Sequence, residues 1–305
     1  MGNTEDLVLI DQLELESMEI HRLCEDDNSY MIFFVEVNRH IKEINNLFKV
    51  YRYNLETFLE GYMVFNSDVV QPKKMFINGD YITVNAMVTN IVSAGTSLVD
   101  SINCFCKECE KNKKYFSKNL IENFYDNVIS SEYDNEFAYK FGYFLRNYSQ
   151  HCHLPVSFNN EKYSFDLYRI LITPHFNFNK KLKKELEEYR DKIMTDYADT
   201  PTISFSNTLV RYNYSIHKIY YLFFEKFKSM NDELLKNLEE RITKDPEIIN
   251  KNNGYIFYEN DDSIHCINPG NHPEELYSSL QEEALDYYEK ERKHVEGFLQ
   301  SSFII

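Results

Sequence analysis

Tryptophan is missing from this 305-residue chain, and the residues that break helices are scarce, with 8 Gly and 7 Pro. Tyrosine and phenylalanine are plentiful by contrast, at 24 and 23 residues. An all-β sandwich needs frequent turns, and turns are built mostly from Gly, Pro, Asn and Asp. Few breakers and many bulky side chains therefore favour long packed helices.

Positive charge is also in deficit, since the formal net charge is -16 at pH 7. A protein that coats nucleic acid non-specifically carries a basic surface, so the composition speaks against that class. It leaves room for an enzyme that holds RNA at a local site. The lysine-rich runs 111–114 and 180–184 are candidate RNA guides, although acids follow the second run at helical spacing, as on a solvated face.

The sequence has no run of about 18 apolar residues, the length of a membrane span. Its first residues lack the basic start and apolar run of a signal peptide, so we expect a cytoplasmic protein without a membrane-bound part. Six cysteines without framework spacing are typical of reduced thiols. Cys104, Cys106 and Cys109 form one cluster, but a structural zinc needs four ligands, so we interpret them as small buried side chains.

Apolar residues recur at three- and four-residue steps in the first half of the chain, which predicts helices. Four are expected, at about 30–62, 80–107, 115–130 and 135–152. The segment 69–74, which contains Pro72, breaks the first from the second, and Pro155 ends the fourth because proline cannot continue a helix. Short connections between the four predict an antiparallel bundle over residues 1–156.

Residues 157–305 are predicted to be a mainly helical region of unknown role that contains short β-hairpins. Turn-forming residues between β-favouring runs predict hairpins within 157–172 and 255–267. Helices are expected at about 179–197, at about 207–242 and from Pro273 onward, where proline suits a first helical turn. The predicted fold class is therefore mainly α, a helical bundle with an α-rich C-terminal extension.

The fourth predicted helix carries the chain's strongest functional pattern. At about 100° per residue, its apolar side chains fall on one stripe that should face the core. These are Ala138, Phe141, Leu145, Tyr148 and Cys152. Arg146, Asn147 and His151 lie roughly 100° or more from the centre of that stripe, on the side that the bundle should leave uncovered.

These three residue types suit phosphate chemistry. Histidine exchanges protons near neutral pH, arginine offers a planar donor fork that fits phosphate oxygens, and asparagine can orient either group without adding charge. We therefore take Arg146, Asn147 and His151 as the candidate catalytic residues. The alternative is that these three side chains are merely solvated on the surface, with His151 stabilising the helix C-terminus.

The segment from Arg146 and Asn147 to His151 resembles the Arg-Asn-x3-His signature of the HEPN superfamily. That resemblance implies a signature on a late helix of an antiparallel bundle, and two copies that pair to form one composite site. It further implies metal-independent cleavage of RNA by attack of a ribose 2′-hydroxyl, in a toxin or an anti-phage abortive-infection effector. Toxins of the subgroup silenced by nucleotidylation carry Tyr two residues after the histidine, where this chain has His153, so an abortive-infection-like branch is favoured.

From this resemblance we expect an endoribonuclease that needs neither cofactor nor metal. A homodimer would form through the fourth helix, with Gly142, Tyr143 and Asn147 near the seam and two copies each of Arg146 and His151 around one phosphate. The expected partners are an RNA substrate and the second copy. An antitoxin or a phage-derived trigger is a further possible partner.

Two other function classes stay open. The bundle can be a non-catalytic interaction or regulatory module that uses the same helices for dimerisation or partner docking. A metal-dependent hydrolase is the other class, with acids at 25–27 and 259–262 and with His265 and His272 near the second group, although turn chemistry explains those acids as well.

Overall fold

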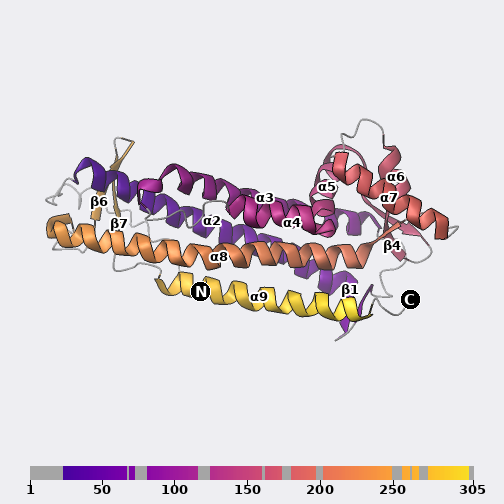
Figure 1. The fold of residues 1–305 in the computed structure, drawn as a ribbon. Coiled ribbons are helices and arrows are strands. Elements are labelled where there is room, and N and C mark those ends of the chain that lie inside the picture. The colour runs from indigo at the N-terminus through magenta and orange to yellow at the C-terminus, as the bar shows by residue number, and fades with distance from the viewer. Residues whose placement is uncertain are drawn as a thin grey trace. The chain divides into compact units, whose positions relative to one another are not determined.

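The computed structural model describes residues 23–66, 69–72, 81–115, 124–159, 162–173, 180–196, 202–248, 256–261, 263–267 and 274–301. Over these residues the chain is mainly α-helical, with short antiparallel strands between the helices (Figure 1). The prediction of a mainly α protein with small hairpins is confirmed.

The helices lie close to the predicted positions. They are α2 (Glu25–Tyr62), α3 (Tyr81–Lys111), α4 (Ser131–Asn135), α5 (Phe137–His151), α6 (Leu167–Ile172), α7 (Lys180–Asp196), α8 (Phe205–Lys244) and α9 (Glu274–Ser301). The third predicted helix is wrong in part: Lys113–Tyr115 is a 3-10 turn, and Tyr125–Ser130 is π-helical and leads directly into α4. Residues 116–123 lie outside the described part of the chain.

Three small sheets connect the helices. Strands β1 (Met63–Asn66) and β2 (Val69–Pro72) pair antiparallel, so the first part of the segment predicted as a simple break is a strand. The hairpin after Pro155 is confirmed as β3 (Val156–Asn159) and β4 (Lys162–Asp166). Its second arm is shorter than predicted because α6 begins at Leu167, and β5 (Thr202–Ser204) adds a third strand that the sequence did not predict. The other predicted hairpin is β6 (Ile256–Asn260) with β7 (Ser263–Ile267).

The chain forms two compact units, and each is assembled from separated segments. Unit 1 comprises residues 1–43, 105–122 and 225–281, and unit 2 comprises residues 44–104, 123–224 and 282–305. The division expected near residue 156 lies inside unit 2. All of α5, α6 and α7 belongs to unit 2, together with parts of the four long helices.

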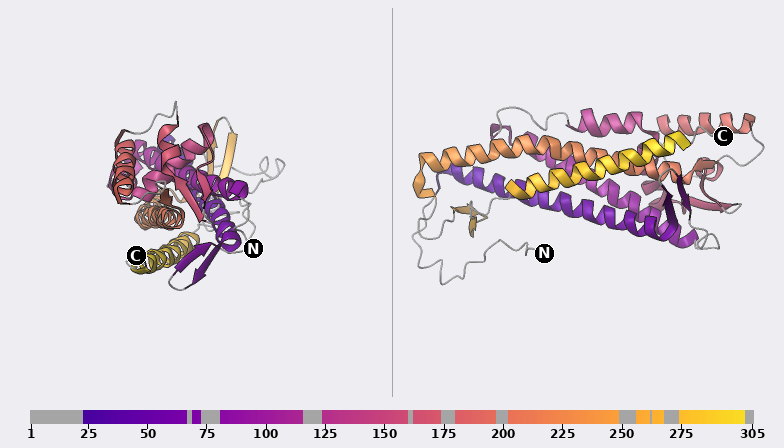
Figure 2. Two further views of the ribbon diagram at one scale, coloured as in Figure 1. Left: turned by 90° about the vertical axis from the view of Figure 1, so that its right-hand side faces the viewer. Right: turned by 90° about the horizontal axis from the view of Figure 1, so that it is seen from below.

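The long helices of unit 2 run alongside one another in both views of Figure 2, and aromatic side chains pack between them. Phe48 of α2 stacks on Tyr220 of α8 with ring centroids 3.6 Å apart. The two hydroxyls of Tyr214 on α8 and Tyr288 on α9 lie 3.1 Å apart, within hydrogen-bond distance. The abundance of Tyr and Phe thus supplies the core of a bundle that has no tryptophan.

One tyrosine of α8 requires glycine on two neighbouring helices. The ring of Tyr212 lies so close to Gly95 of α3 and Gly142 of α5 that a Cβ atom at either position would overlap it. Its hydroxyl donates to the Val92 carbonyl oxygen at 3.3 Å. Gly95 and Gly142 therefore mark two places where α3 and α5 approach the same ring of α8 closely.

A buried polar cluster fixes α9 to α8 and α2. The Tyr51 hydroxyl donates to Asn213 Oδ1 at 2.9 Å, and Asn213 Nδ2 donates to the Glu291 carboxylate at 2.5 Å. His294 Nδ1 lies 3.1 Å from the same carboxylate oxygen. His217 Nδ1 lies 2.9 Å from the Asn213 carbonyl oxygen, which can only accept, so Nδ1 carries the proton.

Burial lowers the pKa of His217, because the charged imidazolium would be desolvated among the surrounding rings. The pKa of Glu291 is also lowered: desolvation opposes the charged carboxylate, but the hydrogen bond from His294 and the nearby His217 outweigh it. Because both pKa values are lowered in the folded protein, the free energy of unfolding should decrease as the pH falls.

Unit 1 has its own arginine-centred cluster. Arg241 of α8 donates to Asp26 Oδ2 at 2.9 Å and also pairs with Asp27, while its guanidinium lies over the Tyr30 ring. Two of the three acids at the start of α2 that the sequence offers as metal ligands, Asp26 and Asp27, are therefore engaged in ion pairs.

Helix α3 has the length and apolar composition of a membrane span, which the sequence did not predict. Half of its most apolar window is buried inside the protein, however. Asn85 on this helix is buried and bonds both backbone groups of Val156, with its Oδ1 accepting at 2.7 Å and its Nδ2 donating at 2.9 Å. Core helices of water-soluble proteins pass the same length test, so α3 is weak evidence for a membrane.

Candidate functional site

Helix α5 begins and ends where its sequence dictates. Glu136 caps it in an extended conformation and accepts a hydrogen bond from the Ala138 backbone N–H at 3.2 Å. The helix ends at His151, followed by Cys152 with non-helical angles and then by Pro155. The fourth predicted helix is thus confirmed, and its last residue is the candidate catalytic histidine.

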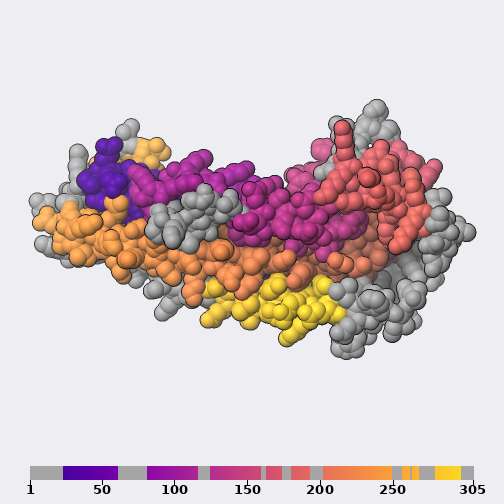
Figure 3. All heavy atoms as spheres, viewed as in Figure 1, coloured from indigo at the N-terminus to yellow at the C-terminus, as the bar shows by residue number. Residues whose placement is uncertain are grey.

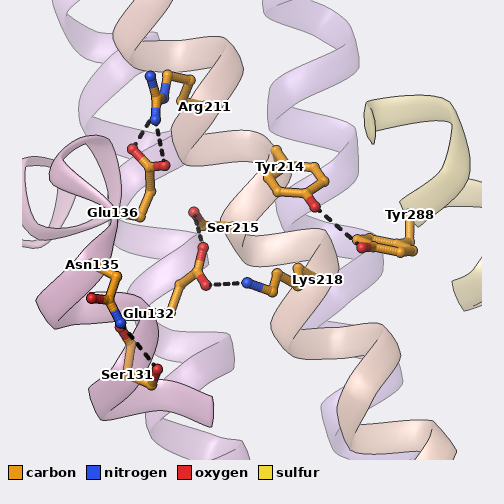
Figure 4. A network of polar contacts seen from close by, with 9 residues as sticks. All are labelled: Ser131, Glu132, Asn135, Glu136, Arg211, Tyr214, Ser215, Lys218 and Tyr288. Atoms are coloured by element: carbon orange, nitrogen blue, oxygen red, sulfur yellow. Dashed lines mark hydrogen bonds and ion pairs between the residues drawn. The ribbon is translucent and has the colours of Figure 1, made fainter. Parts of the chain in front are cut away.

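Ion pairs to α8 anchor the segment that leads into α5, as Figure 4 shows. The Glu132 carboxylate, in a residue only 7% exposed, accepts from the Ser215 hydroxyl at 2.7 Å and from Lys218 Nζ at 2.6 Å. The Glu136 carboxylate accepts from Arg211 in a two-pronged pair at 2.8 and 3.1 Å. Ion pairs of one buried and one half-buried carboxylate thus fix where α5 starts on the bundle.

Helix α7 covers one side of the first half of α5. Lys140, only 3% exposed, donates to both oxygens of Glu185 on α7 at 2.8 and 3.0 Å. Lys181 of α7 donates to Asp134 of α4 at 2.8 Å. Atoms of α7 accordingly form the molecular surface beside α4 and α5 in Figure 3.

This cover corrects one expectation. Lys140, Asn147 and His151 lie on one side of α5, because seven and eleven residues are close to whole numbers of turns. The sequence predicts that the bundle leaves this side uncovered, but α7 covers its upstream end. Only the second half of α5 is open there, with Asn147 half-buried and His151 exposed.

The predicted core stripe of α5 is confirmed, and the predicted seam is not. Ala138, Phe141, Leu145 and Tyr148 are buried, and Cys152 is half-buried. Gly142 was expected at a seam between two copies, but it is buried against Tyr212 of the same chain. The expectation failed because glycine permits close approach of any neighbour, and the nearest one is α8.

A narrow open stripe remains on the second half of α5. Tyr143, Asn147 and Gln150 lie along it, and Tyr143 is 39% exposed. At about 100° per residue, Arg146 lies roughly 70° to one side of this stripe and His151 roughly 70° to the other. The cation and the imidazole therefore flank one accessible strip of helix.

Arg146 has an unmet hydrogen-bonding group. Its Nη1 donates to Asn147 Oδ1 at 3.1 Å, so the two candidate residues contact each other as expected. Its Nε is buried and has no hydrogen-bond partner among the residues that the structure describes. A buried donor of this kind calls for an acceptor, and an anionic oxygen would satisfy it best.

The other arginines in α-helices of the described chain mostly pair with acids. Six do so within 4 Å: Arg39, Arg52, Arg190, Arg211, Arg241 and Arg292. No described carboxylate pairs with Arg146 in this way. In a chain of net charge -16, an arginine without an acidic partner is a notable exception.

His151 and its neighbours form the end of α5. The imidazole of His151 is exposed, and His153 lies two residues on with its ring against Tyr148, centroids 6.3 Å apart. The Tyr148 hydroxyl lies 3.2 Å from the hydroxyl of Thr173, just after α6. Contacts from α6 to this end of α5 were not predicted, since nothing in the sequence says where α6 returns.

The competing metal and RNA-guide sites look different in the structure. Among the described residues, no group of three or more His, Cys, Asp or Glu side chains is arranged to hold a metal ion. Cys106 and Cys109 are buried on α3 as expected, but Cys104 is exposed, so the interpretation as buried side chains is wrong for that residue. Burial raises the pKa of Cys109 to about 12. Asp262 and His272 lie outside the described residues, and His265 stacks on Tyr258.

The two lysine-rich runs are engaged with acids. Lys111 pairs with Glu108, and Lys114 with Asp26. In the second run, Lys183 and Lys184 pair with acids one turn later on α7. These pairs support the interpretation of the second run as a solvated helix face and weaken both runs as guides for RNA.

No family model, curated protein or solved structure matches this chain. The functional argument therefore depends on the residues at the second half of α5 and on their surroundings.

Proposed function

We propose that this protein is a metal-independent endoribonuclease of HEPN type, acting in the cytoplasm as a toxin or anti-phage abortive-infection effector. The observation that carries the proposal is the buried, unpartnered Nε of Arg146 beside the open stripe that His151 flanks on its other side. A phosphate oxygen would satisfy that donor, and an exposed imidazole can move a proton near neutral pH.

Two copies pair through the open stripe of α5, with Tyr143, Asn147 and Gln150 at the contact. The two-fold axis brings two Arg146 and two His151 side chains around one scissile phosphate. The half-buried Asn147 holds the Arg146 guanidinium through the 3.1 Å hydrogen bond, so the donor fork is already oriented.

In the reaction, a ribose 2′-oxygen attacks phosphorus and the bond to the 5′-oxygen breaks. One His151 takes the 2′-hydroxyl proton, and an imidazolium gives a proton to the departing 5′-oxygen. Arg146 stabilises the negative charge that builds on the phosphoryl oxygens. The products are a 2′,3′-cyclic phosphate and a 5′-hydroxyl, with no net consumption of protons.

The test is incubation of the purified protein with total tRNA and messenger RNA in EDTA, with the product ends mapped. His151→Ala should lower kcat by about 10²–10⁴-fold, the usual contribution of an acid–base residue. Arg146→Ala should lower it by about 10²–10³-fold, as for the loss of a transition-state donor. Matched controls are His40→Ala and Arg39→Ala in unit 1, which should cleave like the wild type.

Tyr143→Glu tests the paired arrangement, because it places like charges opposite each other on the open stripe. Sedimentation should show monomers, and cleavage should fall with dimerisation. An active monomer would remove the composite site from the proposal. Wild-type dimers that never cut RNA, or cleavage abolished by EDTA, would overturn the ribonuclease and leave a helical interaction module. In cells, induced expression should arrest growth only with His151 intact.

A further inference from the structure

Beyond α5, a second arginine without an acidic partner lies close to the end of the same helix. Arg169 on α6 is exposed, and no described carboxylate lies within ion-pair distance of its guanidinium. It therefore shares with Arg146 the property that separates both from the six paired arginines of the described chain.

Hydrogen bonds fix α6 to the last turn of α5. The Thr173 hydroxyl donates to the Arg169 carbonyl oxygen at 2.8 Å. Since that uses the only proton of the Thr173 hydroxyl, the Tyr148 hydroxyl must donate in the 3.2 Å bond between the two. Tyr148 is three residues before His151, so the contact ties the C-terminal end of α6 to the turn of α5 that also carries the candidate histidine.

The strands before α6 make this placement rigid. Phe165 of β4 is fully buried and packs edge-on against Phe141 of α5, with ring centroids 5.3 Å apart. Asp166 then caps α6 by accepting from the Arg169 backbone N–H at 2.9 Å. The carboxylate nearest to Arg169 in sequence is thus engaged with a backbone donor.

The electrostatics of Tyr148 agree with this placement. Burial raises the pKa of Tyr148, and the hydrogen bond with Thr173 and the positive charge of Arg169 act in the opposite direction. Tyr168, 54% exposed beside Arg169, offers a ring on which a nucleobase can stack.

We propose that Arg169 binds a backbone phosphate of the RNA next to the scissile one, so that α6 forms the substrate-binding wall beside His151. The proposal rests on the ribonuclease function above and gives a role to the segment after Pro155. Arg169 acts equally on the bound substrate and on the transition state, so it contributes to KM and leaves kcat unchanged.

The experiment measures binding and cleavage separately. Binding uses a short fluorescein-labelled oligoribonucleotide with 2′-O-methyl groups, which cannot undergo attack, and follows fluorescence anisotropy over a series of salt concentrations. Arg169→Gln should raise Kd about 3–10-fold and reduce the slope of log K against log salt by about 0.7, the value for one phosphate contact on a single strand. KM for cleavable RNA should rise in parallel with kcat unchanged.

Arg169→Lys keeps the charge without the planar fork, so its Kd should lie between those of the wild type and Arg169→Gln. Arg190→Gln on α7 removes an arginine already paired with Asp191 and should bind like the wild type. If the wild type binds and cuts RNA while Arg169→Gln has the same Kd and salt slope, the Arg169 assignment is overturned and the ribonuclease stands. If the wild type neither binds nor cuts RNA, both proposals fall.

Discussion

Charged side chains at the start of α5 are paired within the chain, whereas those near its C-terminal end are not. Upstream, the charges of Glu132, Glu136 and Lys140 are each met by an opposite charge within unit 2. Downstream, Arg146 and the exposed His151 meet no carboxylate among the described residues. Paired charges fix a helix in place, whereas unpaired ones keep their capacity to bind something outside the chain.

Enclosure differs between the two segments in the same direction. The first half of α5 is buried on nearly every side, with Lys140 under α7 and Gly142 under Tyr212. The second half keeps an open stripe from Tyr143 onward. A rigidly held first half and an accessible second half are what a site built on a helix requires.

The largest effect on stability is expected from Glu132→Gln in the upstream segment. The amide keeps the shape but removes the carboxylate charge, so the ion pair with Lys218 becomes a neutral hydrogen bond and the Ser215 hydroxyl must accept instead of donate. Urea unfolding should show a loss of about 1–3 kcal/mol. Glu240→Gln, which breaks an exposed pair with Lys236, is the control and should show no measurable change.

Cleavage per folded molecule should survive Glu132→Gln if the upstream charges serve only to position α5. A fall in kcat without a fall in stability would break the comparison, because it would place Glu132 in the chemistry.

Gly142→Ala tests the enclosure of the first half with a smaller expected effect. Overpacking against the Tyr212 ring costs about 1–3 kcal/mol, and alanine returns up to about 1 kcal/mol of helix propensity. The net loss should be on the order of 1 kcal/mol by urea unfolding. Gln150→Ala, on the open stripe of the same helix, should lose nothing. Equal stability of the two variants would show that the ring moves aside and that the first half is not rigid.

The smallest expected effect is a change of stability with pH in the buried cluster that contains His217 and Glu291. The pKa of His217 is lowered in the folded chain, so the unfolded chain binds more protons as pH falls below about 6.5 and stability decreases. The lowered pKa of Glu291 adds a further decrease below about 4.5 by the same sign. Thermal unfolding of the wild type should show both steps.

His217→Gln should remove the step that begins near neutral pH and leave a smaller acid step, since His294 still lowers the pKa of Glu291. An unchanged profile in this variant would mean that protonation of His217 is not coupled to unfolding.

Much of the fold could be predicted because hydrophobic spacing fixes helices well. α5 was predicted to within one or two residues, since Pro155 ends it and its apolar stripe is regular. β5 was missed because Thr202–Ser204 is too short to show alternation and depends on β4 as a partner. The π-helical turn at 125–130 has no signal in spacing either.

The candidate site could be predicted only in part. Residue spacing places Arg146 and His151 away from the core stripe, and the structure agrees that His151 is exposed. Spacing cannot say which neighbour covers a face, so the contacts of Gly142 with Tyr212 and of Lys140 with α7 were missed. Arg169 was missed for the same reason, because its place beside Tyr148 depends on how β3 and β4 turn the chain back.

The Tyr212 ring under Gly95 and Gly142 also sets the axial register of three helices. A shift of α5 by one residue in either direction would replace the glycine with Phe141 or Tyr143, for which the ring leaves no room. α3 is held to the same ring through Gly95, so neither helix can slide along α8. If the proposed ribonuclease is regulated, sliding of α5 along α8 is therefore not the means that this packing allows.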